Sequence, residues 1–457
     1  MPNVTHSFVS TIADDQTQLA LGEVTPSRWN AMHSNAMGVF NVKDTQWAGG
    51  AKGDGITDDT AAINAAIAAL NATAVGGRLY FPAGTYLTNS GTFTTITVPG
   101  IVYGDGFIAT HIISTSTTGT LFTLDSGSVI DMRDMFIENR AASAPTSGAG
   151  VLAPQTGPHP TNNVVMHRVQ IGYFYDNVDC QAIAGVTLFD TCVFLSPVRY
   201  GVRIRNIAQP DNGGWTFINC GFYAGATPPN NGGVPRTSVS ALRWESCSNG
   251  HFVDCSIVGD AGHNGNNFTT GFDASCGGAS GELWIKGCSI EDPQNRCISL
   301  VGVVHNINIA NCETSYNNNS FPTGGAATFI DAAQAVSITG LTGNMATGPN
   351  FTRTVDFNNT CQKVTWSGIA MVGNWSDVLC PVNYSAGAYD PQHGLSGDLI
   401  SAAITCSALF NVGHIGQRLI VTDLLAAPVF NATVTSGSGT GSNKAQVWWN
   451  GTAWVIG

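Results

Sequence analysis

The sequence predicts an all-β protein whose body is a parallel β-helix, a solenoid of stacked coils. Three observations predict it: an apolar pattern that recurs nine times, a small or amide residue at one place in most repeats, and a low content of charged residues. Self-similarity with a period of about 20 to 50 residues is typical of solenoids. A short capping helix near the N-terminus and a small antiparallel β-module near the C-terminus complete the prediction.

Each repeat has apolar residues five and three positions before an anchor residue and two positions after it. Around the anchor Cys220 these are Trp215, Phe217 and Phe222. The side chains at minus five and minus three share one strand face, and those at zero and plus two share another, so the chain turns a corner between the pairs. The nine anchors are Met135, Val169, Cys192, Cys220, Cys255, Cys288, Cys312, Leu341 and Ile369.

The residue before each anchor marks the predicted corner. Gly, Asn and Asp fill seven of these nine positions, and they are the residues that best tolerate a left-handed backbone. Each repeat therefore reads as strand, tight corner, strand. The nine corner residues are Asp134, Arg168, Thr191, Asn219, Asp254, Gly287, Asn311, Gly340 and Gly368.

Stacking the repeats predicts an internal column of five cysteines, Cys192, Cys220, Cys255, Cys288 and Cys312. We favour a buried column of small apolar thiols, because no pair of cysteines has the spacing of a zinc site. Coils about 4.8 Å apart lie within reach of a disulfide, so bridges stay open as an alternative. The sequence predicts no metal site and no cofactor.

The composition argues against several classes of protein. The 457 residues include 18 Lys and Arg, carry a net charge of −12 and show no basic run, which disfavours nucleic acid as a partner. The sequence contains no run of about 20 apolar residues, so it predicts no membrane-spanning helix. Residues Met1 to Asp15 lack the basic and apolar regions of a secretory signal. We therefore expect synthesis in a cytoplasm, where thiols stay reduced.

Three regions are predicted along the chain: a polar segment over 1–38, the β-helix body over 39–385 and a β-module over 386–457. In the body, a helix is expected from Ala61 to Leu70, capped by Asp59 or Thr60 and ended by Gly76-Gly77. A strand from Arg78 to Phe81 follows. This helix could cover the open end of the solenoid and hide unpaired strand edges.

The stretch from Gly50 to Tyr86, which contains Gly53-Asp54-Gly55, Thr57-Asp58-Asp59-Thr60 and Phe81-Pro82-Ala83-Gly84-Thr85-Tyr86, resembles the opening of the pectate-lyase-like family of right-handed β-helices. The resemblance implies that fold, but it implies little about activity, because the family includes polygalacturonases, lyases, epimerases and phage tailspikes. As an alternative, Gly53-Asp54-Gly55 could be a phosphate-binding loop, but the segment lacks the lysine and serine of a P-loop.

Both terminal regions resemble parts of phage tail proteins. His6 to His33 is similar to their short leaders, and about His393 to Gly457 is similar to modules that close many tail fibres. The latter contains an Asn450-Gly451 hairpin turn. Together these resemblances imply a tailspike on the virion, with a phage tail or baseplate protein bound through residues 1–38. They also imply a homotrimer, with the C-terminal module serving in trimerisation or receptor binding.

A charged strip is the first candidate site. An earlier strand in several repeats, roughly ten to sixteen residues before the anchor, carries outward-facing residues that should stack in two columns, Asp179, Arg203, Arg243, Asp273 and Ser299 beside Gln181, Arg205, Glu245, Ser275 and Val301. Glu245 and Asp273 fall diagonally on adjacent coils, where paired carboxylates could act as acid and nucleophile or base. Asp179 and the arginines Arg203, Arg205 and Arg243 could hold an anionic or hydroxylated sugar. The alternative is a surface ladder of salt bridges without function.

Two further candidates are weaker. Glu291 and Asp292, near Asp260, could serve acid chemistry or bind a cation, or they could be solvated turn residues. Trp284 faces outward in this register and could stack on a sugar. The ordered motifs of polygalacturonases are absent: Gly262-His263-Asn264-Gly265 and Arg203-Ile204-Arg205 only echo two of them, in the wrong order.

Three functions remain open from the sequence. The first is a tailspike that recognises a bacterial surface polysaccharide (capsule, O-antigen or exopolysaccharide) and cleaves it by a hydrolase or lyase reaction. The second is a structural or receptor-binding spike without turnover, and the third is a secreted pectate-lyase-like enzyme. The sequence favours the first, since a long rigid solenoid presents a shallow face to a repeating sugar.

Overall fold

The computed structural model of the protein describes most of the body and parts of the C-terminal region. The described ranges are 38–316, with breaks at 74, 126–128, 155–162, 182–185, 206–213, 225–236, 246–248 and 260–266, followed by 326–331, 333–345, 353–357, 364–373, 382–384, 403–404, 418–424, 433–434, 443–449 and 453–456. The predicted segment 1–38 lies outside them except for its last residue. The predicted domain boundaries stay predictions.

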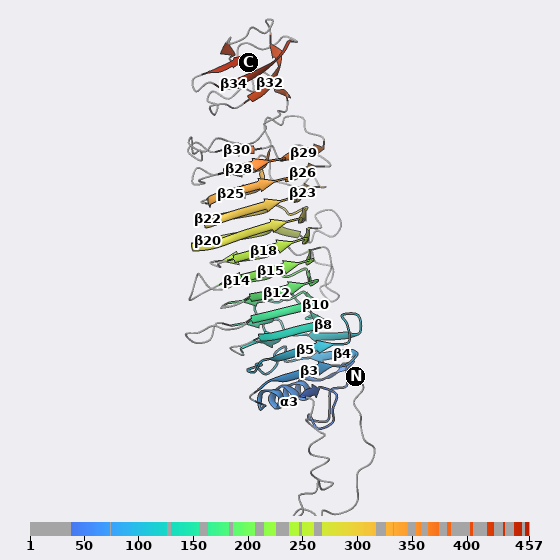
Figure 1. Ribbon diagram of the computed structural model, residues 1–457. Coiled ribbons are helices and arrows are strands. Elements are labelled where there is room, and N and C mark those ends of the chain that lie inside the picture. Colours follow the sequence, from blue (N-terminus) through green and yellow to red (C-terminus); the bar gives the residue numbers. More distant parts are fainter. Residues whose placement is uncertain are drawn as a thin grey trace, which may run out of the picture.

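The body is a parallel β-helix, which confirms the predicted fold (Figure 1). Its strands stack in register on three faces. The first face contains β7 (Phe122–Thr123), β9 (Ala149–Ala153), β11 (Asp176–Cys180), β14 (Tyr200–Arg205), β17 (Thr237–Glu245), the first parts of β20 (Asn267–Lys286) and β22 (Arg296–Ala310), β24 (Ala326–Ile330), β27 (Arg353–Phe357) and β30 (Val382–Tyr384).

The second and third faces follow in each coil. The second contains β1 (Val39–Asn41), β3 (Gly77–Phe81), β5 (Gly100–Gly104), the first parts of β8 (Val129–Asn139) and β10 (Asn163–Gly172), β12 (Val186–Asp190), β15 (Gly214–Ile218), β18 (Asn249–Val253), the last parts of β20 and β22, β25 (Ala333–Thr339) and β28 (Val364–Ser367). The third contains β2 (Asp54–Asp58), β4 (Gly84–Thr88), β6 (Thr110–Ser114), the last parts of β8 and β10, β13 (Val193–Leu195), β16 (Gly221–Tyr223), β19 (Ser256–Val258), β21 (Ser289–Glu291), β23 (Glu313–Tyr316), β26 (Thr342–Met345) and β29 (Ala370–Gly373).

The corner between the second and third faces lies where the repeat predicts it. All nine predicted corner residues have φ between 52° and 66°. The residue three positions before each anchor stacks on its counterparts, as Met166, Phe189, Phe217 and Phe252 do on successive coils. The rings of Phe189 and Phe217 are 4.5 Å apart, and those of Phe217 and Phe252 are 4.8 Å apart. Stacked identical side chains thus bind neighbouring coils together.

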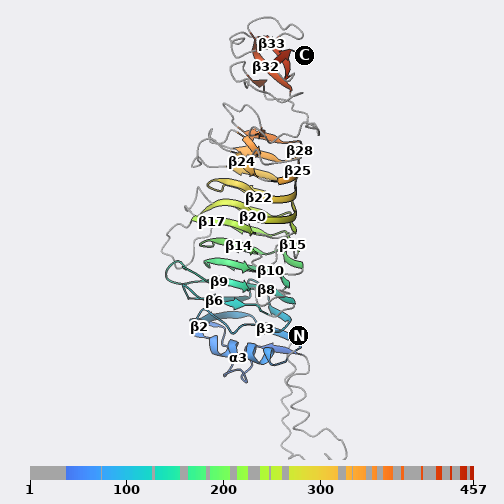
Figure 2. The same cartoon turned by 90° about the vertical axis from the view of Figure 1, so that its left-hand side faces the viewer.

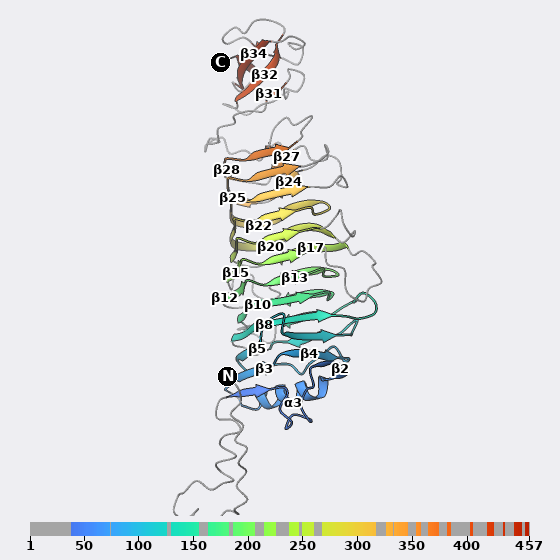
Figure 3. The same cartoon turned by 90° about the vertical axis from the view of Figure 1, so that its right-hand side faces the viewer.

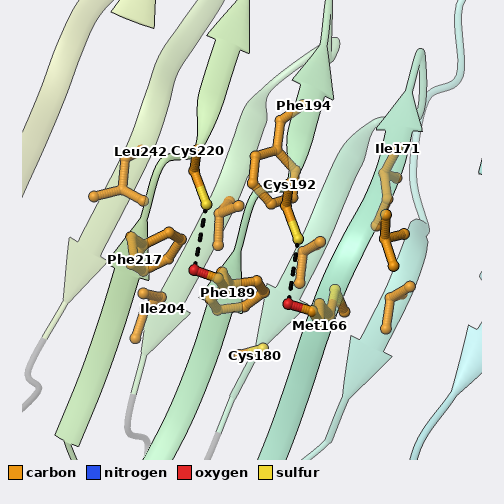
Figure 4. Close-up of a cluster of buried hydrophobic side chains, with 14 of the residues drawn as sticks. Met166, Ile171, Cys180, Phe189, Cys192, Phe194, Ile204, Phe217, Cys220 and Leu242 are labelled. Carbon is orange, nitrogen blue, oxygen red and sulfur yellow. Dashed lines mark hydrogen bonds between the residues drawn. The ribbon is translucent and has the colours of Figure 1, made fainter. Parts of the chain in front are cut away.

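The five cysteines of the predicted column are buried next to the corner between the second and third faces. Figure 4 shows two of them, Cys192 and Cys220. Cys192 and Cys220 donate hydrogen bonds to the carbonyl oxygens of Met166 and Phe189, at 3.5 and 3.4 Å. The hydrogen bond with Cys220, together with burial, raises the pKa of Cys255 to about 12. The cysteines that the structure describes are all free thiols: Cys180, Cys192, Cys220, Cys255, Cys288, Cys297 and Cys312.

The only helix among the described residues, α3 (Thr60–Asn71), lies across the N-terminal end of the stack (Figures 2 and 3). It buries Ile63, Ile67 and Leu70, so it covers the first coil as predicted. Asp59, one of the two predicted caps, is the N-cap residue, although its side chain makes no capping hydrogen bond. Asp59 precedes the helix but accepts hydrogen bonds from the backbone amides of Lys52 and Gly53, at 2.6 and 3.0 Å. Its carboxylate therefore pins the preceding loop.

The C-terminal strands form a separate five-stranded sheet. It comprises β31 (Ala403–Ile404), β32 (Arg418–Leu424), β33 (Thr433–Val434), β34 (Asn443–Trp449) and β35 (Trp454–Ile456). The antiparallel pairing of β34 with β35 confirms the predicted hairpin. The parallel pairing of β31 with β32 was not predicted. No helix in the described ranges is long and apolar enough to cross a membrane.

Candidate functional site

The predicted charged column lies on the first face, in the predicted order. Asp179 pairs with Arg203, Arg203 with Arg243, Arg243 with Asp273, and Asp273 with Ser299 on successive coils. In the second column, Arg205 pairs with Glu245. We call Asp179, Arg203, Arg205, Arg243, Glu245 and Asp273 the charged strip. It spans four neighbouring coils.

A continuous set of ion pairs joins four residues of the strip. Arg203 Nη2 donates to Glu245 Oε2 at 3.0 Å, and Arg243 Nε donates to Glu245 Oε1 at 2.9 Å. Arg243 Nη1 also donates to Asp273 Oδ2. Arg243 therefore bridges the two candidate catalytic carboxylates, and Glu245 is held by two guanidinium groups.

The remaining two residues of the strip form a bidentate pair. Arg205 donates to both carboxylate oxygens of Asp179, through Nε at 3.2 Å and Nη2 at 2.8 Å. Gln181 adds a third hydrogen bond to Asp179 at 3.2 Å. Bidentate pairing fixes the plane of both groups, so this end of the strip is preorganised.

Burial and pairing move the pKa values of the two candidate catalytic carboxylates in opposite directions. Burial alone would raise the pKa of Glu245, but the hydrogen bonds from Arg243 and Arg203 outweigh it and lower the pKa. Burial raises the pKa of Asp273, against the opposing effect of Arg243. Neighbouring carboxylates with divergent pKa values are the usual arrangement of an acid and a base.

The strip rests on a fully apolar layer. The residues that alternate with it point inward, as predicted, and Val202, Ile204, Leu242 and Trp244 have no exposed surface while Phe272 is 2% exposed. Trp244 lies between Arg243 and Glu245 in sequence and so anchors the strand beneath them. A packed strand positions functional side chains more precisely than a loop does.

A further arginine–aspartate ion pair, which the sequence analysis did not predict, lies beside the strip. Arg199 pairs with the buried carboxylate of Asp176, with Nε to Oδ1 at 2.9 Å. Its guanidinium lies over the rings of Tyr175 and Tyr200, at 4.6 and 4.8 Å from their centroids. Arg203 also lies over Tyr200, at 5.4 Å. Arg199 precedes β14 and is outside the repeating pattern, and Tyr175 meets it only in the fold, so the sequence carried no signal for this pair.

The first face continues beyond the predicted column. The predicted column ends at Ser299, and β24 follows it on the next coil and places Phe329 beside Ser299. Arg296 lies over the Phe329 ring, 4.0 Å from its centroid. The charged column therefore gives way to an aromatic residue.

Trp284 is exposed, as predicted, but it lies on a different face from the strip. It is in the last part of β20, beside His251 on the second face, with ring centroids 5.8 Å apart. Trp284 Nε1 donates to Glu282 Oε2 at 3.2 Å, and the side chain is 45% exposed. One sugar unit on the strip would not reach it.

Glu291 and Asp292 also lie away from the strip. Glu291 ends β21 on the third face and accepts a hydrogen bond from the Ser289 hydroxyl at 2.9 Å. Asp292 is 9% exposed and has φ of 50°, so it forms the corner after that strand. Asp260 lies outside the described residues. No group of three or more His, Cys, Asp or Glu in the described part of the chain could hold a metal ion.

Sequence comparison matches one segment. The family described as rhamnogalacturonase A/epimerase, pectate lyase-like, matches residues 39–144. The mannuronan C5-epimerases AlgE1 and AlgE3 of Azotobacter vinelandii are 56% and 58% identical over 52 residues, which is 11% of this chain. The matched segment spans only 3% of the length of each of these relatives.

Structural comparison finds β-helices at low sequence identity. Full-length tailspike protein 2 from an Escherichia coli O157:H7 bacteriophage aligns with a TM-score of 0.50 and 12% identity, over 88% of this chain and 60% of that one. The A-module of the Azotobacter vinelandii mannuronan C-5 epimerase AlgE4 aligns with a TM-score of 0.49 and 16% identity, over 78% of this chain and 100% of that one. Residues 39–144 thus match the pectate-lyase-like family, as predicted, and they open a parallel β-helix whose neighbours include a phage tailspike.

Proposed function

We propose that the protein is a phage tailspike that binds a bacterial surface polysaccharide along the charged strip and cleaves a glycosidic bond there. One observation carries the proposal: Glu245 and Asp273 lie on adjacent coils, share Arg243 as a partner, and have pKa values displaced in opposite directions. The strip is outward-facing, so a long chain can lie along it.

The pKa directions assign the two roles. Glu245 stays ionised at neutral pH and acts as the base, while Asp273, whose pKa is raised, is a carboxylate paired with Arg243 in the free protein and acts as the acid after it takes up a proton. Their backbones are offset by one coil and two residues, or about 8 Å. That offset suits an inverting reaction, in which a water molecule fits between the carboxyl groups.

The other residues of the strip serve binding. Arg203 and Arg205 present donors to sugar hydroxyls in charge-assisted hydrogen bonds, and Asp179 accepts from them. Tyr175 and Tyr200 serve binding indirectly, because their rings hold the Arg199 guanidinium beside the strip. Trp284 would contact a different stretch of a long polysaccharide, on the second face. Glu291 and Asp292 have no part in this reaction, and their role in acid chemistry stays a separate prediction.

The comparisons agree with a carbohydrate-related role. The curated relatives are named as epimerases of mannuronan, and one structural neighbour is titled a tailspike. The tail-like terminal segments add the phage context: residues 1–38 would attach to a tail or baseplate protein, and the spike would assemble as a homotrimer on the virion. A secreted carbohydrate enzyme would share the body but would not need those segments.

A spike that binds without cleaving is the second candidate. The observation in its favour is that both candidate catalytic carboxylates are ion-paired with arginine, as in a purely structural ladder. Product release separates the two candidates, because a binder adsorbs to the polysaccharide and liberates nothing.

The test uses purified protein spotted on lawns of encapsulated bacteria. An enzyme produces a halo and releases reducing ends or unsaturated sugars. Glu245→Gln and Asp273→Asn should each lower release at least 100-fold, because general acid–base catalysis contributes about that much. The matched control is Asp134→Asn, which breaks an ion pair with Arg168 at the corner between the second and third faces, away from the strip. Full release by Glu245→Gln would exclude the proposed base.

A further inference from the structure

We propose that the polysaccharide bound along the charged strip is neutral rather than acidic, an inference that rests on the proposed function of this strip. The observation is a balance of charge. The strip and its neighbouring pair contain four arginines and four carboxylates, and each arginine is paired: Arg199 with Asp176, Arg203 with Glu245, Arg205 with Asp179, and Arg243 with Glu245 and Asp273.

The pairing uses the edges of the guanidinium groups that would otherwise bind a sugar carboxylate. Arg205 and Arg199 each present Nε and Nη2 to one aspartate, which is the edge that grips a carboxylate in bidentate fashion. Arg199 is also covered by two tyrosine rings.

An acidic sugar would have to displace a protein carboxylate from its arginine. The displaced group would be left poorly solvated: the side chains of Asp176 and Asp179 are only 3% and 8% exposed, and a buried unpaired charge is costly. The net charge of −12 adds long-range repulsion of a polyanion.

A neutral sugar meets no such cost. Its hydroxyls can donate to carboxylate oxygens and accept from the remaining guanidinium N–H groups, and both kinds of hydrogen bond are strengthened by charge. Because the network is neutral as a whole, binding should depend little on salt, whereas attraction of a polyanion would be screened.

The charge balance can be tested with sodium polygalacturonate as the acidic probe. We expect the wild type not to bind it at low ionic strength, and Asp179→Asn, which leaves Arg205 unpaired, to bind it at least five-fold more strongly than the control Asp134→Asn. Both variants remove one negative charge, but only the first does so in the strip. Circular dichroism checks that each is folded.

The host polysaccharide supplies the second arm. Polysaccharide purified from a strain on which the protein forms a halo or adsorbs should contain no uronic acid or other acidic group. Its binding should change less than two-fold between 50 and 300 mM salt, on the order of what screening does to a neutral ligand.

Several results would overturn the inference, and they differ in whether they also refute the proposed function. Wild-type binding of polygalacturonate that is lost in Arg205→Gln, or an acidic host polysaccharide, would refute neutrality and leave polysaccharide binding intact. No gain by Asp179→Asn over its control would show that charge balance is not what excludes acidic sugars. Failure to adsorb to any bacterial polysaccharide would remove the proposed function as well.

Discussion

Replacing Arg243 by Gln tests whether the strip is an interdependent network or a row of indifferent surface pairs. Arg243 donates to both Glu245 and Asp273. The side chain of Asp273 is 17% exposed, and that of Arg243 is 21% exposed. Truncation should leave Asp273 as a largely buried carboxylate without its cation, while Glu245 keeps Arg203.

The expected magnitude follows from this burial. Breaking a fully buried pair costs about 3 to 5 kcal/mol, and a fully exposed pair contributes about 0 to 1 kcal/mol. With four-fifths of both side chains covered, Arg243→Gln should lower the free energy of unfolding by about 2 kcal/mol at pH 7. The double variant Arg243→Gln/Asp273→Asn should recover about half of that loss, since it removes the stranded charge.

Urea unfolding followed by tryptophan fluorescence measures the effect, because Trp244 is buried beside Arg243. The cost of Arg243→Gln should also shrink as the pH falls and Asp273 becomes protonated. A loss below about 0.5 kcal/mol, with no recovery in the double variant, would identify the strip as an ordinary surface ladder. It would also refute the pairing on which the assigned roles depend.

Three further predictions concern the corners, the carboxylates and the thiols. Thr191, a β-branched residue at φ 55°, should be replaceable by Asn with a gain of about 1 kcal/mol, and Asn219→Thr should lose about as much; paired urea midpoints measure both, and equal midpoints would contradict the strain. Carbon-13 NMR should find the pKa of Glu245 below, and that of Asp273 above, the usual value of each side chain. The lowered pKa of Glu245 contributes stability that is present above its unfolded pKa and is lost as pH falls through its folded pKa. The raised pKa of Asp273 favours the folded state at low pH, and this contribution is lost as pH rises. Titration of both carboxylates at their usual pKa values would contradict both expectations. Iodoacetamide at pH 8 should leave the described buried thiols unmodified until denaturant is added, as mass spectrometry would show, and rapid native labelling would contradict their burial; these are Cys180, Cys192, Cys220, Cys255, Cys288, Cys297 and Cys312.

The coil register was predictable because a β-helix repeats one physical constraint many times. Each corner needs a residue that accepts positive φ, and each inward position needs an apolar side chain. A coil whose residues fit this pattern poorly can therefore be assigned from the coils on either side of it. Thr191 and Arg168 are poor corner residues, yet both adopt the corner backbone. The same register placed Asp179, Arg203, Arg243 and Asp273 in one column before any contact was known.

Features outside the repeat were harder to predict. Arg199 lies in the turn before β14, where no periodicity applies, so its pairing with Asp176 depended on side-chain geometry. Asp59 was expected to cap the helix because it precedes an apolar run, but two loop amides compete for its carboxylate. Trp284 was assigned to the substrate site because it faces outward, but it faces outward from the second face, whereas the strip lies on the first.

The division of the solenoid into faces limits what one site can do. A polysaccharide that lies along the strip follows the first face from β11 to β20 and meets Asp179, then Arg203, then Arg243 and Asp273 as it crosses successive coils. Successive coils are about 4.8 Å apart, and the rungs that the polysaccharide meets carry different contacts. The Asp179–Arg205 pair at one end and the Glu245–Arg243–Asp273 set at the other differ in geometry. This difference fits the proposal that one end of the strip binds the polysaccharide and the other performs the chemistry.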